Sequence, residues 1–181
     1  MPDIEVRRLG VEDWAEFRSV RLTALQESPE AFVASLDDEA AESEDFWRER
    51  MVRSTRLVAQ VDGVPVGVAS VGEYADEENA AQLFGLWVEP AKRGSGVASA
   101  LVKAGARTAA DSGYRHLLYW VGTDNGRAVA FASGFGFRPT SDRRPMRVHS
   151  DDDGEEEIAM TLPLAADPGG FGGNGFGGMS F

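Results

Sequence analysis

Cysteine is absent from this chain of 181 residues. Without thiols the protein cannot form disulfides, use a thiolate nucleophile or build a cysteine-based zinc site. Long apolar runs are missing too, because no stretch approaches the roughly 18 apolar residues of a membrane-spanning helix. The first residues, Met1 to Glu5, lack the basic and then apolar pattern of a secretory signal. We therefore expect a soluble cytoplasmic protein without a membrane partner.

Basic residues are outnumbered by acidic ones. The chain has 18 Lys and Arg residues against 30 Asp and Glu residues, which gives a formal net charge of −12. Such a chain repels the phosphate backbone, so we predict no nucleic-acid partner. An acidic surface is compatible with a cationic amine substrate, but selection for solubility produces the same composition.

The length and composition are those of one globular domain. Hydrophobic residues make up 43% of the chain and charged residues 27%, which is ordinary for a protein with a core. From residue 167 onward glycine dominates, and such a segment cannot offset its ordering entropy by burial. We therefore predict a domain at residues 1–166 and a flexible Gly/Phe-rich tail at residues 167–181. Docking of the tail's phenylalanines into a groove or onto a partner subunit is the alternative.

Hydrophobic periodicity predicts alternating strands and helices. Strands are expected at residues 4–9, 57–61, 64–71, 83–88, 116–121, 143–149 and 157–162. Helices are expected at residues 13–27, 45–51, 96–112 and 125–134. The acidic run 151–156 lacks the ligand spacing of a calcium loop, so we interpret it as an exposed hairpin tip and predict no metal site.

The segment 83–98 carries the most information about function. An apolar strand leads through a Pro-bounded turn into Gly94-Ser95-Gly96 and then into a helix. The first amides of a helix have no partner within it and lie at the positive end of its dipole, so such a junction binds anions. Gly94 and Gly96 lack a Cβ, which lets a phosphate approach the main chain.

A second informative segment follows the apolar strand that ends at Val121. It contains Asn125-x-x-Ala128 and leaves its helix through Gly136-Phe137. Together with Arg93-x-x-Gly96-x-Ala98, this segment resembles the GNAT superfamily of N-acetyltransferases. The resemblance covers about residues 3–164.

The resemblance implies a fold and an activity. The expected fold is α/β, of the α+β kind, with a central mixed β-sheet of about six to seven strands flanked by about four helices. The expected activity is acetyl-CoA-dependent N-acetyl transfer to a primary amine, by direct attack in a ternary complex. Residues 11–54 would form the acceptor wall, and the acceptor itself is not specified. Dimers are frequent in this family, which leaves a homodimer open.

The resemblance also assigns the contacts to acetyl-CoA. The strand before the glycine turn would pair with the pantetheine at a bulge, for which Gly85 is the natural position. The turn and the helix start would hold the pyrophosphate, and Asn125 would contact the pantetheine or cap its helix. The predicted cofactor-binding residues are Leu86, Trp87, Val88, Arg93, Gly94, Ser95, Gly96, Val97, Ala98, Ser99 and Asn125.

The catalytic groups depart from the family pattern. Ala132 occupies the position at which many relatives carry a tyrosine that protonates the departing thiolate. Tyr119 and Tyr74 are the candidates to replace it. Glu73 is the first candidate for the base, because an alkyl ammonium must lose a proton before it attacks. Alanine at position 132 also favours the alternative function, a non-catalytic acyl-CoA-binding or interaction module of the same fold.

Overall fold

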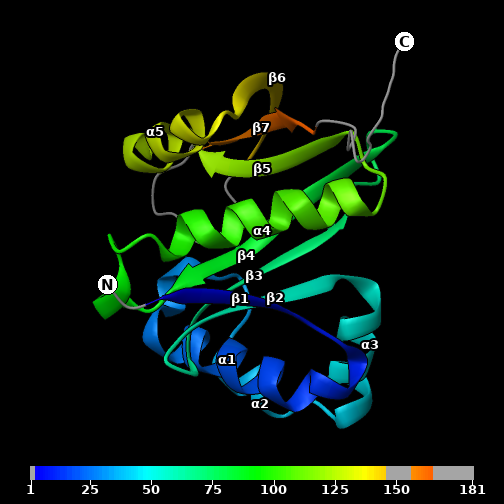
Figure 1. Cartoon of the computed structure of the whole chain (residues 1–181), viewed down its shortest axis with the longest axis vertical. Coiled ribbons are helices and arrows are strands. Elements are labelled where there is room, and N and C mark those ends of the chain that lie inside the picture. Colours follow the sequence, from blue (N-terminus) through cyan, green and yellow to red (C-terminus); the bar gives the residue numbers. More distant parts are fainter. Residues whose placement is uncertain (1–2, 146–155, 165–181) are drawn as a thin grey trace.

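A computed structural model describes residues 3–145 and 156–164 of the chain (Figure 1). Its sheet has seven strands in the order β1-β2-β3-β4-β5-β7-β6. The strands are β1 (Ile4–Leu9), β2 (Thr55–Val61), β3 (Val64–Glu73), β4 (Ala80–Val88), β5 (His116–Gly122), β6 (Arg138–Pro145) and β7 (Glu156–Pro163). The α-helices are α1 (Trp14–Glu27), α2 (Leu36–Ala40), α3 (Glu44–Arg53), α4 (Val97–Asp111) and α5 (Gly126–Phe135).

The sheet is mixed, as the sequence predicts. Strands β4 and β5 run parallel, whereas the other neighbouring strands pair antiparallel. The expected fold class is therefore confirmed, with one helix more than expected. The additional helix is α2, a short helix capped by Ser35, whose Oγ accepts a hydrogen bond from the amide of Asp38 at 3.1 Å.

Two expectations concern the C-terminal part of the chain. Strand β6 begins at Arg138, earlier than predicted, and pairs with β7 as expected. The predicted strand residues 146–149, most of the acidic run and the whole Gly/Phe-rich tail lie outside the described residues. The division into a domain and a tail therefore stays a prediction.

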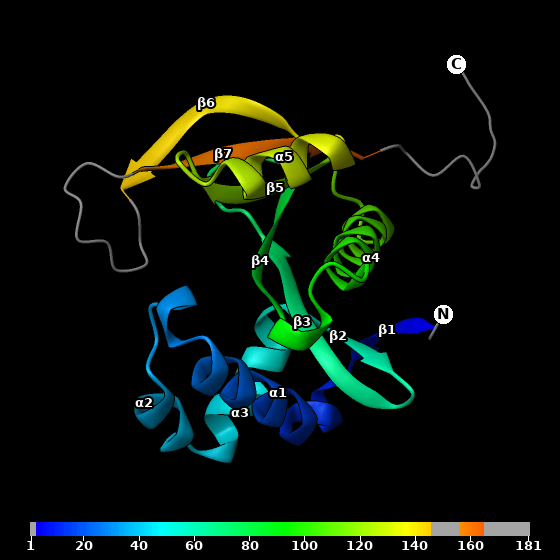
Figure 2. The ribbon, with the colours of Figure 1, turned by 90° about the vertical axis from the view of Figure 1, so that its left-hand side faces the viewer.

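Each face of the sheet is covered by its own apolar core. On one face, Leu101 of α4 and buried residues of α5 pack with Leu83 of β4. On the other face, Phe17 of α1 and Trp47 of α3 pack against Val58 of β2. Figure 2 shows α4 on the opposite side of the sheet from α1, α2 and α3. Strands covered on both faces read as continuous apolar runs, which explains the pattern in β2 and β3.

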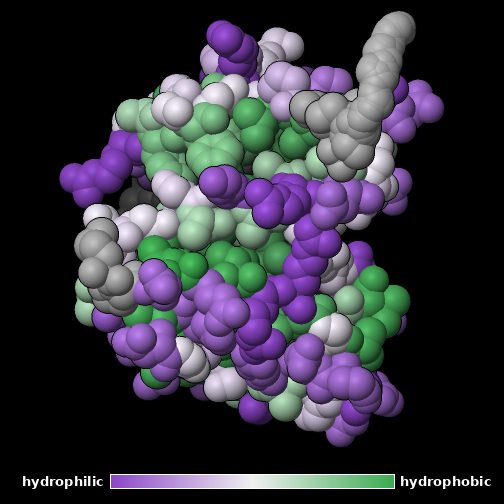
Figure 3. Space-filling view, viewed as in Figure 1, coloured by the Kyte–Doolittle hydropathy of each residue, from purple (hydrophilic) through white to green (hydrophobic). Residues whose placement is uncertain are grey.

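Helix α4 lies close against the strands because Gly105 faces them. A Cβ at this position would stand 2.8 Å from Cδ1 of Leu83, so a larger residue would force the helix away from β4. The opposite face of α4 carries the exposed residues Lys103, Arg107 and Asp111. This face forms a hydrophilic band across the middle of Figure 3. The close packing fixes where the N-terminal end of α4 meets the sheet.

No helix in the described part of the chain combines the length and apolar character that crossing a membrane requires.

Candidate active site

Strands β4 and β5 diverge in the middle of the sheet. Their parallel pairing begins at Ala80 and His116 and ends at Leu83 and Tyr119, although both strands continue further. Beyond this point β4 stays paired with β3 and β5 stays paired with β7. The two strands therefore part, and within residues 3–145 and 156–164 their facing edges pair with no other strand.

A β-bulge sits on β4 where the strands part. Val68 and Ser70 of β3 face Trp87 and Phe84 of β4, so β4 holds one residue more than β3 in this interval. Gly85 has a φ of 63°, a left-handed conformation that glycine adopts without strain. The bulge predicted at Gly85 is thus present, and it turns the strand edge toward the opening.

The turn before α4 leaves helix amides free, as the sequence predicts. Gly94 and Gly96 have φ angles of 82° and 96°, and α4 begins at the next residue. The first backbone hydrogen bond of the helix runs from the amide of Ala100 to the carbonyl of Gly96 at 3.0 Å. The amides of residues 97–99 therefore have no partner inside this helix of 15 residues. Amides in this position, at the positive end of a helix dipole, are suited to bind an anion.

A cavity of about 300 Å³ lies beside these amides. The surface is hollowed at this end of α4 in Figure 3. Six of the predicted cofactor-binding residues line it: Val88, Arg93, Gly94, Gly96, Ala98 and Ser99. Lys92 and Phe131 line it too, and sequence reasoning missed both. The apolar position of Phe131 on α5 was visible, but no sequence pattern indicates that α5 approaches α4.

Four other predicted residues lie around this cavity with different roles. Trp87 and Val97 are buried in the two cores, and Leu86 lines a second cavity described below. The hydroxyl of Ser95 donates to the carbonyl of Lys92 within the turn. Contacts between the backbone groups of these residues and the cofactor stay a prediction.

Arg93 is exposed, but its guanidinium hydrogen-bonds to the protein. Its Nε donates to the carbonyl of Val88 at 3.0 Å, and its Nη2 donates to Oγ of Ser28 at 3.3 Å. The indole Nε1 of Trp87 donates to the same Ser28 oxygen at 3.1 Å. The buried Ser28 therefore links the end of α1, strand β4 and the glycine turn. These hydrogen bonds indicate that Arg93 holds the shape of the turn.

Asn125 caps α5. Its Oδ1 accepts a hydrogen bond from the amide of Ala128 at 3.1 Å. The capping role that the sequence allowed is confirmed, and the contact with pantetheine stays a prediction. Ala132 lies on the same helix, is fully buried in the core and offers no proton donor.

A second cavity, of about 590 Å³, opens where β4 and β5 part. It is lined by β4 from Gln82 to Leu86, by residues 31–34 after α1, and by Tyr119 of β5. Tyr119 is largely buried, and this burial, together with the negative charge of Glu157, raises the pKa of its hydroxyl. A raised pKa keeps the hydroxyl protonated at neutral pH, so that it can donate a proton or a hydrogen bond.

Glu157 of β7 is the one carboxylate among the described residues that line this second cavity. Its side chain is 12% exposed and accepts a hydrogen bond from Nε of Arg144 at 2.7 Å. The Arg144 guanidinium lies 4.0 Å from the ring centroid of Trp120, whose buried Nε1 has no partner in the described part of the chain. Sequence reasoning missed Glu157, although strand alternation places it opposite in direction to the buried Ile158.

Glu73 lies elsewhere. It is exposed at the end of β3 and lines a different hollow, together with Thr108 of α4 and Ser112 just after this helix. Tyr74, the other tyrosine considered, lines a further hollow beside Asp76 and Glu77. The structure therefore brings Tyr119 to the opening between the strands and does not bring Glu73 there.

No set of three or more His, Asp or Glu side chains within residues 3–145 and 156–164 is arranged to hold a metal ion.

Comparisons with known proteins agree with this geometry. A profile of the acetyltransferase (GNAT) family matches residues 14–137. An uncharacterized N-acetyltransferase of Methanocaldococcus jannaschii is 30% identical over 95 residues, which are 50% of this chain and 42% of that protein. The chain thus spans less than half the length of this relative.

Solved structures show the same fold at low sequence identity. An acetyltransferase of the GNAT family from Streptococcus pneumoniae superposes with a TM-score of 0.69 at 17% identity, covering 90% of this chain and all of the other. A proposed acetyltransferase of Salmonella typhimurium, solved with its cofactor acetyl-CoA, superposes with a TM-score of 0.66 at 18% identity, covering 90% of this chain and 94% of the other.

Proposed function

Because the chain belongs to the GNAT acetyltransferase family, we propose that it transfers the acetyl group of acetyl-CoA to a primary amine by direct attack in a ternary complex. The observation that carries this proposal is the set of free amides at the start of α4, beside a cavity that adjoins β4. The cavity beside α4 and the second cavity lie along the same strand, the first lined by Val88 and the second by residues 82–86, which include the bulge. Donor and acceptor can therefore approach the same stretch of β4.

The described residues fit acetyl-CoA. The amides of residues 97–99 would hold the diphosphate, and Gly94 and Gly96 leave the turn open to it. The edge of β4 after the bulge would pair with the pantetheine, and Phe131 would contact it from α5. When bound, the cofactor supplies an activated thioester whose carbonyl carbon the amine attacks. The protein contributes position, polarisation and proton transfer.

Proton transfer would use one residue on each side of the opening. Tyr119 packs with the core that contains α4 and α5, on the side from which the cofactor approaches. Its strand neighbour Trp120 packs into a separate small core, consistent with alternation along β5. Glu157 points to the same side as Trp120, next to Arg144. This arrangement supports a role for Glu157 on the acceptor side and for Tyr119 on the donor side.

We assign the two groups accordingly. Glu157 accepts the proton that the acceptor ammonium loses, directly or through water, and the freed amine forms a C–N bond with the thioester carbonyl carbon. When the C–S bond breaks, Tyr119 donates its proton to the departing thiolate, and the second proton released by the acylated nitrogen returns, directly or through water, to the tyrosinate. This assignment replaces Glu73 by Glu157 and keeps Tyr119 as the acid. It follows from where the side chains lie.

Changing Tyr119 to phenylalanine should lower kcat roughly 100-fold, the lower end of the effect expected when one positioned proton donor is lost. KM for acetyl-CoA should change little, because the hydroxyl acts on the leaving group. Steady-state kinetics with a thiol reagent that detects free CoA measure both constants. Tyr114→Phe removes a hydroxyl outside both cavities and is the matched control. An unchanged kcat in Tyr119→Phe would show that solvent protonates the thiolate.

The test of the function itself is a turnover screen. The purified protein, acetyl-CoA and a broad set of primary amines should release CoA only when both substrates are present, and mass spectrometry should identify the acetylated amine. The buried Ala132, where a proton donor is missing, favours a second candidate, a non-catalytic acyl-CoA-binding or interaction module. Saturable binding of acetyl-CoA without turnover of any amine would support that candidate.

A further inference from the structure

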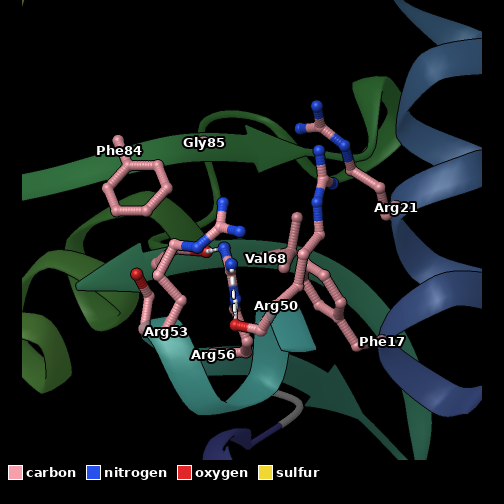
Figure 4. Close-up of a pocket in the computed structure, with 10 residues that line it drawn as sticks. Phe17, Arg21, Arg50, Arg53, Arg56, Val68, Phe84 and Gly85 are labelled. Atoms are coloured by element: carbon pink, nitrogen blue, oxygen red, sulfur yellow. Dashed lines mark hydrogen bonds between the residues drawn. The ribbon is translucent and has the colours of Figure 1, made fainter. Parts of the chain in front are cut away.

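Four arginines surround a small cavity beside the β4 bulge. They are Arg21 of α1, Arg50 and Arg53 of α3, and Arg56 of β2, and the cavity has a volume of about 160 Å³ (Figure 4). Phe17, Val68 and Phe84 form its apolar walls. Such a concentration of positive charge contrasts with the net charge of −12 for the whole chain.

Arg56 is buried without a carboxylate partner in the described chain. It is 6% exposed, and its three hydrogen bonds go to neutral oxygens. Nε and Nη2 donate to the carbonyl of Arg50 at 3.2 and 3.0 Å, and Nη1 donates to Oγ of Ser70 at 2.7 Å. A guanidinium has five N–H donors, so two of them have no partner among residues 3–145 and 156–164.

The ring faces of Phe17 and Phe84 hold the Arg56 guanidinium in place. Its central carbon lies 4.8 Å from the ring centroid of Phe17 and 5.6 Å from that of Phe84. Burial, together with the positive charges of Arg50, Arg21 and Arg53, lowers the pKa of Arg56 to about 10. The side chain still carries its charge at neutral pH. A buried charge of this kind is costly unless an opposite charge meets it.

The carboxylates near the cluster pair with arginines other than Arg56. Glu39 lies between Arg21 and Arg50 and hydrogen-bonds both of them at 3.0 to 3.3 Å. Glu49 stands 3.6 Å from Arg53, and both of these side chains are largely exposed. Neither carboxylate hydrogen-bonds Arg56. The cluster therefore keeps an excess of positive charge directed at the cavity.

The small cavity adjoins the second cavity, the one of about 590 Å³ where β4 and β5 part. Both are lined by Arg21, Arg50, Phe84 and Gly85. A molecule with its amine beside β4 in the larger cavity can thus extend a second group past the bulge to Arg56. Glu157 provides a negative charge in the larger cavity, and the arginines provide positive charge in the smaller one.

We propose that the small cavity binds a carboxylate of the acceptor, so that the substrate is an amine that also carries a carboxylate group. This inference rests on the proposed acetyl transfer. A carboxylate matches the planar fork of an arginine and would accept the two free N–H groups of Arg56. An acceptor that lacks the carboxylate would leave the buried guanidinium unpaired, which gives discrimination against neutral amines.

Paired substrates test the proposal. Straight-chain ω-amino acids and α-amino acids are compared with the corresponding carboxamides, at matched concentrations of acetyl-CoA. At least one carboxylate form should have a kcat/KM at least tenfold above that of its carboxamide. Equal or higher values for the carboxamides throughout the series would overturn the inference and leave the acetyl transfer intact.

Variants locate the effect in the cavity. Arg56→Lys keeps the charge but loses the planar fork, and it should reduce the preference for the carboxylate form, measured as the ratio of kcat/KM for the carboxylate to that for the carboxamide, at least fivefold. Arg53→Gln, a change at a largely exposed side chain, should reduce the preference about threefold without loss of the fold. Arg107→Lys, on the exposed face of α4, is the matched control and should retain the full preference.

A binding measurement separates this inference from the proposed function. Glutarate, a dicarboxylate without an amine, should bind to the CoA-saturated protein with a calorimetric signal that weakens at least fivefold in Arg56→Lys. If no amine is acetylated but glutarate binds in this way, the acetyl transfer fails and the carboxylate site stands. If glutarate binds equally to the wild type, to Arg56→Lys and to Arg53→Gln, or to none of them, the carboxylate site is wrong.

Discussion

Replacement of Ser99 by glutamate should remove most of the affinity for acetyl-CoA and leave the fold intact. Ser99 is exposed in the first turn of α4 and lines the cofactor cavity. A carboxylate there repels the diphosphate and competes for the same free amides. The loss of one or more charge-assisted hydrogen bonds corresponds to about 2 to 3 kcal/mol, or a 30- to 150-fold higher Kd. Isothermal titration calorimetry with CoA and acetyl-CoA measures the change.

The same substitution is favourable for the helix itself. A negative charge in the first turn interacts well with the helix dipole, by about 0.3 to 1 kcal/mol. The melting temperature should therefore stay the same or rise slightly, which separates lost binding from lost folding. Ser19→Glu places the same charge on the exposed face of α1 and is the control. Undiminished affinity in Ser99→Glu would contradict the diphosphate site at α4.

Glu39→Gln should destabilise the protein more than any other single charge removal discussed here. The side chain of Glu39 is 5% exposed and hydrogen-bonds both Arg21 and Arg50, so that it ties α2 to α1 and α3. Removing one partner of such a buried network leaves the arginines without their counter-charge. We expect a loss of about 3 kcal/mol in the free energy of unfolding, and a melting temperature lower by roughly 6 to 12 °C.

The stabilising effect of Glu39 should decrease as the pH falls. Burial by itself raises the pKa of this carboxyl, but the hydrogen bonds and charges of Arg21 and Arg50 outweigh burial, so the pKa lies below its ordinary value of 4.5. A lowered pKa in the folded state contributes stability above the ordinary pKa and loses it as the pH falls through the folded value. The difference between wild type and Glu39→Gln should be constant from pH 7 to about pH 5, and should shrink below that.

Urea unfolding at several pH values measures both effects. Glu49→Gln changes an exposed glutamate on α3 that stands 3.6 Å from Arg53. Exposed pairs contribute about 0 to 1 kcal/mol, so this control should change the stability little. Equal stabilities of the two variants would show that the arginine network around Glu39 does not hold the helices together.

The elements that the sequence predicted well are those with strong local signals. The Asp62-Gly63 turn adopts positive φ angles between β2 and β3, and the helices at 96–112 and 125–134 correspond to α4 and α5. The helix α2 was missed because five residues carry too little periodicity for detection. The early start of β6 was missed because its residues are mostly exposed and show no apolar alternation.

The candidate site also has parts that local sequence signals predict and parts that they do not predict. The glycine turn, the bulge at Gly85 and the cap at Asn125 follow from local sequence, because each depends on a backbone conformation that particular residues favour. Glu157 and Arg56 could not be found in this way, since one lies on β7 and the other on β2. The negative net charge of the chain also did not indicate that arginines line the cavity beside the bulge.

The sequence by itself determined the family, the mixed sheet and the proposed donor end of the site, because an open turn at a helix start and the residues that surround it are contiguous in the chain. The tertiary structure alone decided the proposed acceptor end. There α1, α3 and strands β2, β4, β5 and β7 contribute side chains from distant parts of the chain. Their convergence is set by the packing of the helices onto the two faces of the sheet, and no local pattern encodes it.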